Sequence, residues 1–283
     1  MSEVGDSLQE NTYIFNAESA AEMNRLTIQD RMITKEMGGL LPDSVDPSTL
    51  HRVLDLACGP GEWSLDVAYA YKHMEVMGID LSEKMINYAN SRRWPNVTFR
   101  LMDIRQPLDF PDNTFDFVNA RFLFTFMSKD AWPHLLKECM RITRPGGFVR
   151  LTESESAVGN SPAFEELQIM MARSLHLTGR TFSPLGSQIG ITPMLGGFLQ
   201  QAGYQNIKHR AFAIDFSATG DAHEYMYQNF QLGLLLSRPF LLSMNPISEE
   251  ELGELCNKTL KEMASDDFRA VWYYLSVWGN KPT

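Results

Sequence analysis

Short apolar runs alternate with amphipathic stretches through the first half of the chain. A short apolar run bounded by turn residues is typical of a buried strand, and apolar positions three or four apart are typical of a helix. The expected strands cover residues 53–57, 75–80, 97–102, 115–119 and 148–152. The expected helices cover residues 63–71, 82–92 and 130–142. Because this alternation requires crossover connections, the sequence predicts an α/β fold with a mostly parallel sheet and helices on both faces.

A further helix is expected ahead of the first strand, from about residue 16 to residue 37. Ser19 and Glu22 have the spacing of a capping box, with Asn16 as the alternative cap. Its expected apolar face carries Met23, Leu26, Ile33 and Met37. Residues 1–15 are expected to form a tail.

The chain after residue 152 has a less regular pattern. The expected helices cover residues 161–177, about 193–202, 221–242 and 248–264, and the expected strands cover 204–216 and 268–278. Ser161-Pro162 and Thr192-Pro193 both have the signature of a cap followed by proline at the first helical position. Residues 144–147, Arg-Pro-Gly-Gly, predict a turn before the strand at 148–152.

The composition fits a packed globular protein and argues against several functions. With 283 residues, of which 44% are apolar and 21% charged, the chain is expected to form one large domain with attached helices. The formal charge of −10 disfavours nucleic acid as a partner. Three widely spaced cysteines predict neither a disulfide framework nor a zinc site, and no metal is expected. Because neither a signal peptide nor an apolar run of about 18 residues is found, the protein is expected to be cytoplasmic, with no membrane partner.

The clearest chemical signal lies in residues 53–61, Val-Leu-Asp-Leu-Ala-Cys-Gly-Pro-Gly, where a buried strand meets a glycine turn. Glycine lets a ligand approach the backbone closely, and ligands of parallel sheets bind at the carboxyl ends of the strands. Asp80 ends the second strand and can accept hydrogen bonds from both hydroxyls of a ribose. Asp103 follows the third strand as a partner for an adenine amino group, and Asn119 ends the fourth. Each is an ordinary polar residue taken alone, but their joint placement predicts a nucleoside site.

Two features favour S-adenosylmethionine over a dinucleotide. Ser64 stands where a dinucleotide fold usually has its third glycine. Asp55, inside the first strand, suits an ammonium group and not a pyrophosphate. A ligand with a ribose and an ammonium group but no phosphates matches S-adenosylmethionine.

These segments resemble the motifs of class I S-adenosylmethionine-dependent methyltransferases of the small-molecule type. Residues 53–61 are similar to the family's glycine motif, and residues 78–82 with Met85 are similar to its second motif. Further similar segments are residues 101–104, 115–118, 144–147 and 278–282. The resemblance covers about residues 50–204 and the final strand, and it implies a Rossmann-like seven-stranded sheet with an antiparallel last strand.

The resemblance also implies which residues bind the cofactor. For the methionine part they are Asp55, Gly59 and Gly61 with Ala57 of the same motif; for the ribose, Asp80 with Leu81 and Met85; for the adenine, Asp103 and Ile104; and beside the sulfonium, Asn119 and Ala120. Tyr13 and Arg25 lie outside these motifs. If the N-terminal segment closes over the cofactor, Arg25 can pair with the methionine carboxylate; an exposed helix arginine is the equal alternative.

Segments outside the family core are expected to build the acceptor side. Residues 1–40 are expected to form a tail and a lid helix, which can also exchange between the subunits of a homo-oligomer. Residues 41–283 are expected to form the methyltransferase domain, with helical insertions at about 155–192 and 219–265 around the acceptor pocket. The candidates to line an apolar pocket are Phe122, Phe124, Phe126, Met127, Met170, Met171, Tyr225, Tyr227 and Phe230, about half of which are expected to be ordinary core.

The expected reaction is in-line transfer of the methyl group to the oxygen, nitrogen or carbon of a small, partly apolar metabolite. A base is needed where the acceptor must lose a proton. Glu153 is the first candidate and His176 the second, although a hydrogen-bonded side chain is the better interpretation of His176 and of Glu155. The alternatives are a nicotinamide-dependent oxidoreductase on the same fold, a non-catalytic S-adenosylmethionine-binding protein, and a methyltransferase that acts on a protein.

Overall fold

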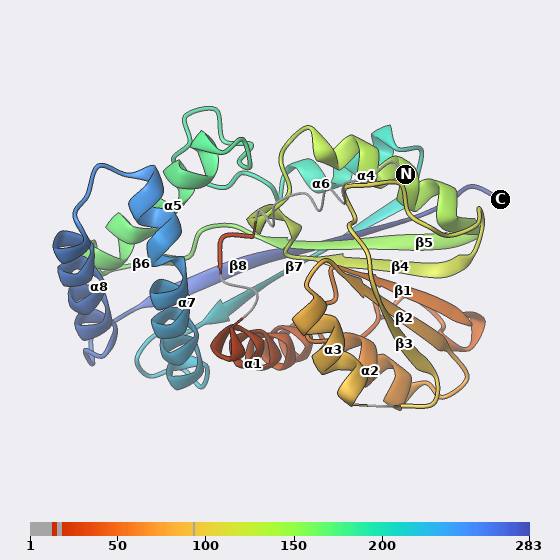
Figure 1. Ribbon diagram of the computed structural model, residues 1–283, viewed down its shortest axis with the longest axis horizontal. Coiled ribbons are helices and arrows are strands. Elements are labelled where there is room, and N and C mark those ends of the chain that lie inside the picture. The colour runs from red at the N-terminus through yellow and green to blue at the C-terminus, as the bar shows by residue number, and fades with distance from the viewer. Residues whose placement is uncertain (1–12, 16–18, 93) are drawn as a thin grey trace, which may run out of the picture.

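In the computed structural model, one β-sheet separates two groups of helices (Figure 1). The structure describes residues 13–15, 19–92 and 94–283. The strands are β1 (Arg52–Leu56), β2 (Glu75–Asp80), β3 (Val97–Leu101), β4 (Phe115–Arg121), β5 (Thr143–Ser154), β6 (Val158–Gly159), β7 (Gln205–Asp215) and β8 (Ala270–Asn280). Across the sheet their order is β3-β2-β1-β4-β5-β8, and both β7 and the short β6 pair with β8.

The pairing of the strands confirms the predicted fold class. Strands β1 to β5 pair in parallel, whereas β8 is antiparallel to β5, β6 and β7. From β1 the chain adds β2 and β3 on one side, and it then returns to add β4 and β5 on the other side of β1. The order of the strands therefore reverses between β1 and β4, and these two parallel strands have their carboxyl ends at the same edge of the sheet. In open α/β sheets, ligands bind in the crevice outside the carboxyl ends of the strands at such a point.

The helices form two layers and one separate group. They are α1 (Ala20–Glu36), α2 (Glu62–Ala70), α3 (Glu83–Ser91), α4 (Ala131–Ile142), α5 (Pro162–Leu177), α6 (Met194–Gln201), α7 (His223–Met244) and α8 (Glu249–Met263), with 3-10 turns η1 (Pro47–Thr49) and η2 (Leu123–Thr125). In Figure 1, α1, α2 and α3 lie below the sheet, and α4 and α6 lie above it. Helices α5, α7 and α8 gather beyond the far end of β8. No helix of the described residues is long and apolar enough to cross a membrane.

The two faces of β1 pack against different helices because side chains alternate along a strand. Val53 belongs to the same buried cluster as Trp63 and Val67 of α2. Leu54 and Leu56 belong instead to the cluster that contains the apolar side of α4. Asp55 shares its face of the strand with Val53 and therefore points toward α2.

Most predicted elements are confirmed to within a few residues, and two details were wrong. The predicted turn at residues 144–147 is part of β5, because Thr143 already pairs with Phe115 ahead of a register shift. Thr192 does not cap α6: Pro193 stands at the N-cap without a side-chain hydrogen bond. Strand β6 was not predicted.

The predicted cap of α1 is confirmed, although the helix begins at Ala20, and of the predicted apolar face only Ile33 and Met37 are buried. The hydroxyl of Ser19 caps the helix and accepts a hydrogen bond from the backbone N–H of Glu22 at 3.0 Å; Asn16 lies outside the described residues. The buried residues of the helix are Glu22, Arg25, Gln29, Asp30 and Ile33. The inward face is mostly polar because α1 borders a ligand-sized cavity as well as the apolar core.

Candidate active site

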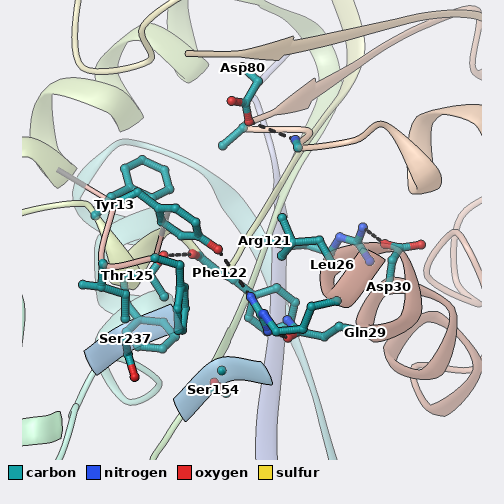
Figure 2. Close-up of a pocket in the computed structure, with 18 of the residues that line it drawn as sticks. Tyr13, Leu26, Gln29, Asp30, Asp80, Arg121, Phe122, Thr125, Ser154 and Ser237 are labelled. Carbon is teal, nitrogen blue, oxygen red and sulfur yellow. Dashed lines mark hydrogen bonds and ion pairs between the residues drawn. The ribbon is translucent and has the colours of Figure 1, made fainter. Parts of the chain in front are cut away.

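A cavity of about 280 Å³ opens at the carboxyl ends of the parallel strands. Its walls are formed by the segments that follow β1 to β5, by one face of α1 and by α5 and α7. Tyr13, Ile14 and Phe15 also line it. Figure 2 shows Tyr13, Asp80 and Arg121 around this space, brought together from three separate parts of the chain. The cavity therefore lies where the sequence placed the nucleoside site.

The turn after β1 leaves one side of its backbone open to the cavity. Gly59 has a φ of +53°, and a Cβ placed on it would meet no atom closer than Leu26 Cδ1 at 3.6 Å. Ala57 lines the cavity with a φ of +52°, a conformation that non-glycine residues rarely adopt and that is often found at functional sites. Gly61 differs from the prediction: it does not line the cavity, and its missing Cβ makes room for the ring of Phe99.

Asp80 is fixed beside this turn by two backbone hydrogen bonds. Its Oδ2 accepts from Gly59 N at 2.9 Å, and its Oδ1 accepts from Ser82 N at 2.8 Å. Burial raises the pKa of the carboxyl, which these hydrogen bonds partly offset. Leu81 and Met85 also line the cavity. The carboxylate predicted for the ribose is therefore pre-positioned at the carboxyl end of β2.

Asp103 and Ile104 follow β3 and line the same wall, as predicted. Arg105, which the sequence reasoning missed, also lines it and is paired with Asp103, with its Nε 2.9 Å from Oδ1 and its Nη2 2.9 Å from Oδ2. The spacing of two residues between Asp103 and Arg105 is the sequence signal that could have indicated this ion pair. This ion pair holds the Asp103 carboxylate in one orientation at the end of β3.

Asp55 belongs to a buried polar row that crosses three strands. Asp55, Asn119 and Arg150 are register neighbours on β1, β4 and β5. Asn119 donates to Asp55 Oδ1 at 2.8 Å and accepts from Arg150 Nε at 2.8 Å, and Ser64 donates to Asp55 Oδ2 at 2.8 Å. Desolvation raises the pKa of Asp55 to about 6, opposed by the nearby charge of Arg121 and by these hydrogen bonds.

This row corrects the expectation for the fourth strand. Asn119 is fully buried within β4 and does not line the cavity, and neither does Ala120, which packs in the apolar core. Asp55 does line it, as predicted. Desolvation lowers the pKa of Arg150 to about 9. The row thus supports the floor of the site from within the sheet.

Tyr13 and Arg25 meet in a buried cluster at the edge of the cavity. Arg25 binds Glu22 through its Nε at 2.7 Å and its Nη2 at 2.6 Å, and it donates to Gln29 Oε1 at 2.6 Å. It also reaches α7, where it donates to Asn229 Oδ1 at 3.1 Å, and the Tyr13 hydroxyl donates to Glu22 at 2.7 Å. The alternative of an exposed arginine is wrong, because Arg25 is 5% exposed.

A second ion pair lines the cavity and was missed by the sequence reasoning. Arg121, the last residue of β4, pairs with Asp30 of α1 and donates to Thr34 at 3.3 Å (Figure 2). The second oxygen of Asp30, Oδ2, is buried and has no hydrogen-bond partner among the described residues. Because 91 residues separate the two partners, no sequence signal links them.

The two predicted bases do not line the cavity. Glu153 is 1% exposed, and its carboxylate accepts from the backbone N–H groups of Leu123 at 2.8 Å and Phe124 at 3.5 Å, so that it braces η2. Desolvation raises the pKa of Glu153 to about 8. His176 is hydrogen-bonded through Nδ1 to the hydroxyl of Thr181 at 2.9 Å.

Glu155 lines the cavity, but its carboxylate is already hydrogen-bonded to a loop. Its Oε2 accepts from Gly190 N at 2.7 Å, and its Oε1 accepts from Thr192 N at 2.9 Å and from the Thr192 hydroxyl at 2.8 Å. The hydroxyl of Thr192, expected at a helix cap, is engaged here instead. The preferred interpretation of Glu155 as a hydrogen-bonded residue agrees with this geometry.

The part of the cavity that lies between η2, α5 and α7 is apolar. Of the nine candidates for an apolar pocket, five line the cavity: Phe122, Phe124, Phe126, Met171 and Phe230. The charged lining residues belong to α1, to the start of α2 and to the strands and the segments that follow them. They are six carboxylates, Asp30, Asp55, Glu62, Asp80, Asp103 and Glu155, and three arginines, Arg25, Arg105 and Arg121. This excess of negative charge suits a cationic ligand. Among the described residues, no three metal-ligating side chains come together.

Comparisons with known proteins agree with this geometry. Residues 53–147 match a family model described as a methyltransferase domain. The protein "Methyltransferase pytC" of Aspergillus terreus is 24% identical over 239 residues, which are 81% of this chain and 71% of that protein. The 27-O-demethylrifamycin SV methyltransferase of Amycolatopsis mediterranei is 35% identical over 136 residues, 46% of each protein.

A solved structure shares the fold. The phosphoethanolamine N-methyltransferase 2 of Haemonchus contortus, in complex with S-adenosyl-L-methionine, has a TM-score of 0.50 and 20% identity, and the match covers 92% of this chain and 52% of that one. The sheet order and the glycine turn, together with the matched domain, define a Rossmann-like methyltransferase. The chain therefore contains a methyltransferase domain, and these similarities support S-adenosylmethionine as the cofactor. The oxidoreductase alternative is not supported.

Proposed function

We propose that this protein transfers the methyl group of S-adenosylmethionine to a small, partly apolar metabolite. The observation that carries the proposal is one continuous cavity with two unlike ends. At one end lie the glycine turn, Asp80 and Asp103, and at the other lie the aromatic residues after β4 and the inner faces of α5 and α7. A donor at the first end and an acceptor at the second would share one enclosed space.

The residues present fit the cofactor. Asp80 would accept from the ribose hydroxyls, and Asp103 with Ile104 would border the adenine. The unpartnered Oδ2 of Asp30 is a buried acceptor that an ammonium group would satisfy, with Asp55 adding negative charge nearby. Arg121, beside Asp30, offers guanidinium donors for a carboxylate. Arg25 is less suited to that carboxylate than predicted, since Glu22 already neutralises it.

When bound, S-adenosylmethionine supplies a methyl group on a positively charged sulfur, activated for displacement. The work left to the chain is to hold donor and acceptor in line and to exclude water, which can lower a barrier by about 7–11 kcal/mol in favourable cases. Among the described lining residues there is no histidine or lysine, and Glu153 is turned away. A base for an acceptor that must lose a proton would therefore have to come from the carboxylates that line the cavity.

We also propose that α1, together with residues 13–15, acts as a lid. Tyr13 and Arg25 join this segment to α7 across the edge of the cavity, through Glu22 and Asn229. Closure by such a segment would keep water from the reacting groups. Exchange of the helix between subunits of a homo-oligomer stays a prediction.

The nature of the acceptor is supported by the apolar lining and by one relative. The Amycolatopsis mediterranei protein is named for a small molecule, 27-O-demethylrifamycin SV, as its acceptor. The formal charge of −10 argues against a nucleic acid. A metabolite of moderate size and low charge is the acceptor that these observations favour.

The proposal can be tested with S-adenosylmethionine that carries a labelled methyl group. The purified protein would be incubated with this donor and a cell extract, and label would be counted separately in the organic-soluble, protein and RNA fractions. We expect label in the organic-soluble fraction, strongly reduced with Asp80→Asn and unchanged with Asp109→Asn, an exposed carboxylate paired with Arg100. Label confined to protein or RNA would refute the acceptor class. Absence of transfer despite tight binding of S-adenosylhomocysteine would refute catalysis and favour the non-catalytic alternative.

A further inference from the structure

Helix α7 turns one continuous face toward the cavity. The lining residues of this helix are Asn229, Phe230, Gly233, Leu234, Ser237 and Leu241, spaced by three or four positions as one helical face requires. Phe230, Leu234 and Leu241 are large, whereas Gly233 and Ser237, four positions apart on this face, are small. The face is therefore hollowed in the middle of the helix.

Crowding does not explain the glycine at position 233. A Cβ placed on Gly233 would meet no atom within 4 Å, whereas a Cβ on Gly253 of α8 would lie 3.3 Å from a guanidinium nitrogen of Arg238. Gly233 is not among the glycines with a positive φ. Glycine inside a helix is less favourable than alanine, because it loses more backbone freedom on folding. The space left by its missing side chain belongs to the cavity.

A buried hydroxyl without a partner lies on the same cavity. Ser154, the last residue of β5, is 0% exposed, and its Oγ has no hydrogen-bond partner among the described residues. It lines the cavity and is labelled in Figure 2. An unsatisfied buried hydroxyl is costly, and a hydrogen bond to a polar atom of a bound molecule would remove that cost.

The cavity wall beside α7 is mostly apolar and carries no charge, with Gln168 of α5 as a neutral polar member. Leu167 and Met171 of α5 line it with Ile189, and Trp272 of β8 has its indole N–H fixed by the carbonyl of Glu155 at 2.7 Å. The lining residues that α5, α7 and β8 contribute include no charged side chain. An ionised molecule would lose its hydration in this compartment without a compensating charge.

We propose that Gly233 is a specificity-determining residue, whose missing side chain leaves the space for the bulky apolar body of the acceptor, and that Ser154 hydrogen-bonds a polar atom of that acceptor. The proposal rests on the function proposed above and narrows it. The acceptor class is a neutral, ring-containing or branched metabolite with at least one hydroxyl or carbonyl group. A thin linear or charged acceptor would not require this hollow.

The test uses N-phenyl-1-naphthylamine, a neutral two-part aromatic probe whose fluorescence rises in apolar surroundings, and the full chain saturated with S-adenosylhomocysteine. The variants are Gly233→Leu and, as the matched control, Gly197→Leu. Gly197 is also helical, in α6, also has no atom within 4 Å of an added Cβ, and does not line the cavity. We expect the dissociation constant of the probe to rise at least tenfold with Gly233→Leu and to change less than twofold with Gly197→Leu.

Calorimetry with S-adenosylhomocysteine separates this proposal from the function on which it rests. Equal probe binding by wild type and Gly233→Leu, with cofactor-product binding retained in both, would overturn the role of Gly233. Failure of the wild type to bind S-adenosylhomocysteine would instead overturn the proposed function. If Gly233→Leu does not fold, Gly233→Ala gives the same comparison: a two- to fivefold weakening supports the proposal, and unchanged probe affinity refutes it.

Discussion

The buried carboxyl of Glu153 is predicted to make the stability of this protein fall as the pH rises. Desolvation raises its pKa from 4.5 to about 8, against the two hydrogen bonds that it accepts from Leu123 and Phe124. The folded protein therefore holds a proton that the unfolded chain releases at a lower pH. The stabilisation is complete below about pH 4.5 and is lost progressively until about pH 8.

The size of the effect follows from this interval. One pKa unit corresponds to about 1.4 kcal/mol, so the rise in the pKa of Glu153 from 4.5 to about 8 can change the free energy of unfolding by at most ~5 kcal/mol. The variant Glu153→Gln removes the ionisation but keeps a side chain of similar shape, whose amide oxygen can still accept from Leu123. The melting temperature of the variant minus that of wild type should therefore increase by about 10 °C from pH 5 to pH 9, since each kcal/mol shifts a melting temperature by roughly 2–4 °C.

Differential scanning calorimetry of both proteins from pH 5 to pH 9 tests this expectation. The decisive quantity is the difference between the two melting temperatures, because other groups titrate equally in both. Glu165→Gln, an exposed glutamate on α5, serves as the control and should show a constant difference from wild type. A difference for Glu153→Gln that stays flat or shrinks with pH would refute the reasoning. Because Glu153 does not line the cavity, we also expect its kcat to stay within about threefold of wild type.

Three further predictions concern the site. Asp80→Asn should weaken binding of S-adenosylhomocysteine by about 10- to 150-fold, from the loss of ~1.5–3 kcal/mol in hydrogen bonds to a charged group; calorimetry measures this, and equal affinity would contradict the ribose assignment, with Asp109→Asn as the control. Arg25→Ala should lower the free energy of unfolding by ~3–5 kcal/mol in urea titrations, because it leaves the fully buried Glu22 unpaired; an unchanged midpoint would show that the pair does not matter. Gly233→Ala should raise the free energy of unfolding by ~1 kcal/mol, and a loss of stability would reveal a contact at this position that the structure lacks.

The local features of the site could be predicted from sequence because they depend on short-range patterns. An apolar run, a glycine turn and a helix N-terminus follow one another in residues 53–64, and Asp80 and Asp103 each follow an apolar run directly. Residues of this kind lie at a strand end whatever the rest of the fold does. The structure places both carboxylates on the cavity.

The errors at Asn119 and Glu153 share one cause. The apolar pattern ends at residues 119 and 152, whereas β4 continues to Arg121 and β5 to Ser154. Backbone hydrogen bonds to neighbouring strands extend each strand by two residues, so Asn119 and Glu153 lie within the sheet. Arg121 and Ser154 stand at the true ends and line the cavity.

By itself, the sequence determined most of the strands and helices, the mostly parallel sheet and the donor half of the site, because hydrophobic period and turn chemistry act over a few residues. Only the tertiary structure decided the other half. The pairing of Asp30 with Arg121, the contact of Arg25 with Asn229 and the hollow at Gly233 each join segments far apart in the chain. Such contacts depend on how helices pack over a completed sheet, and no local pattern encodes that packing.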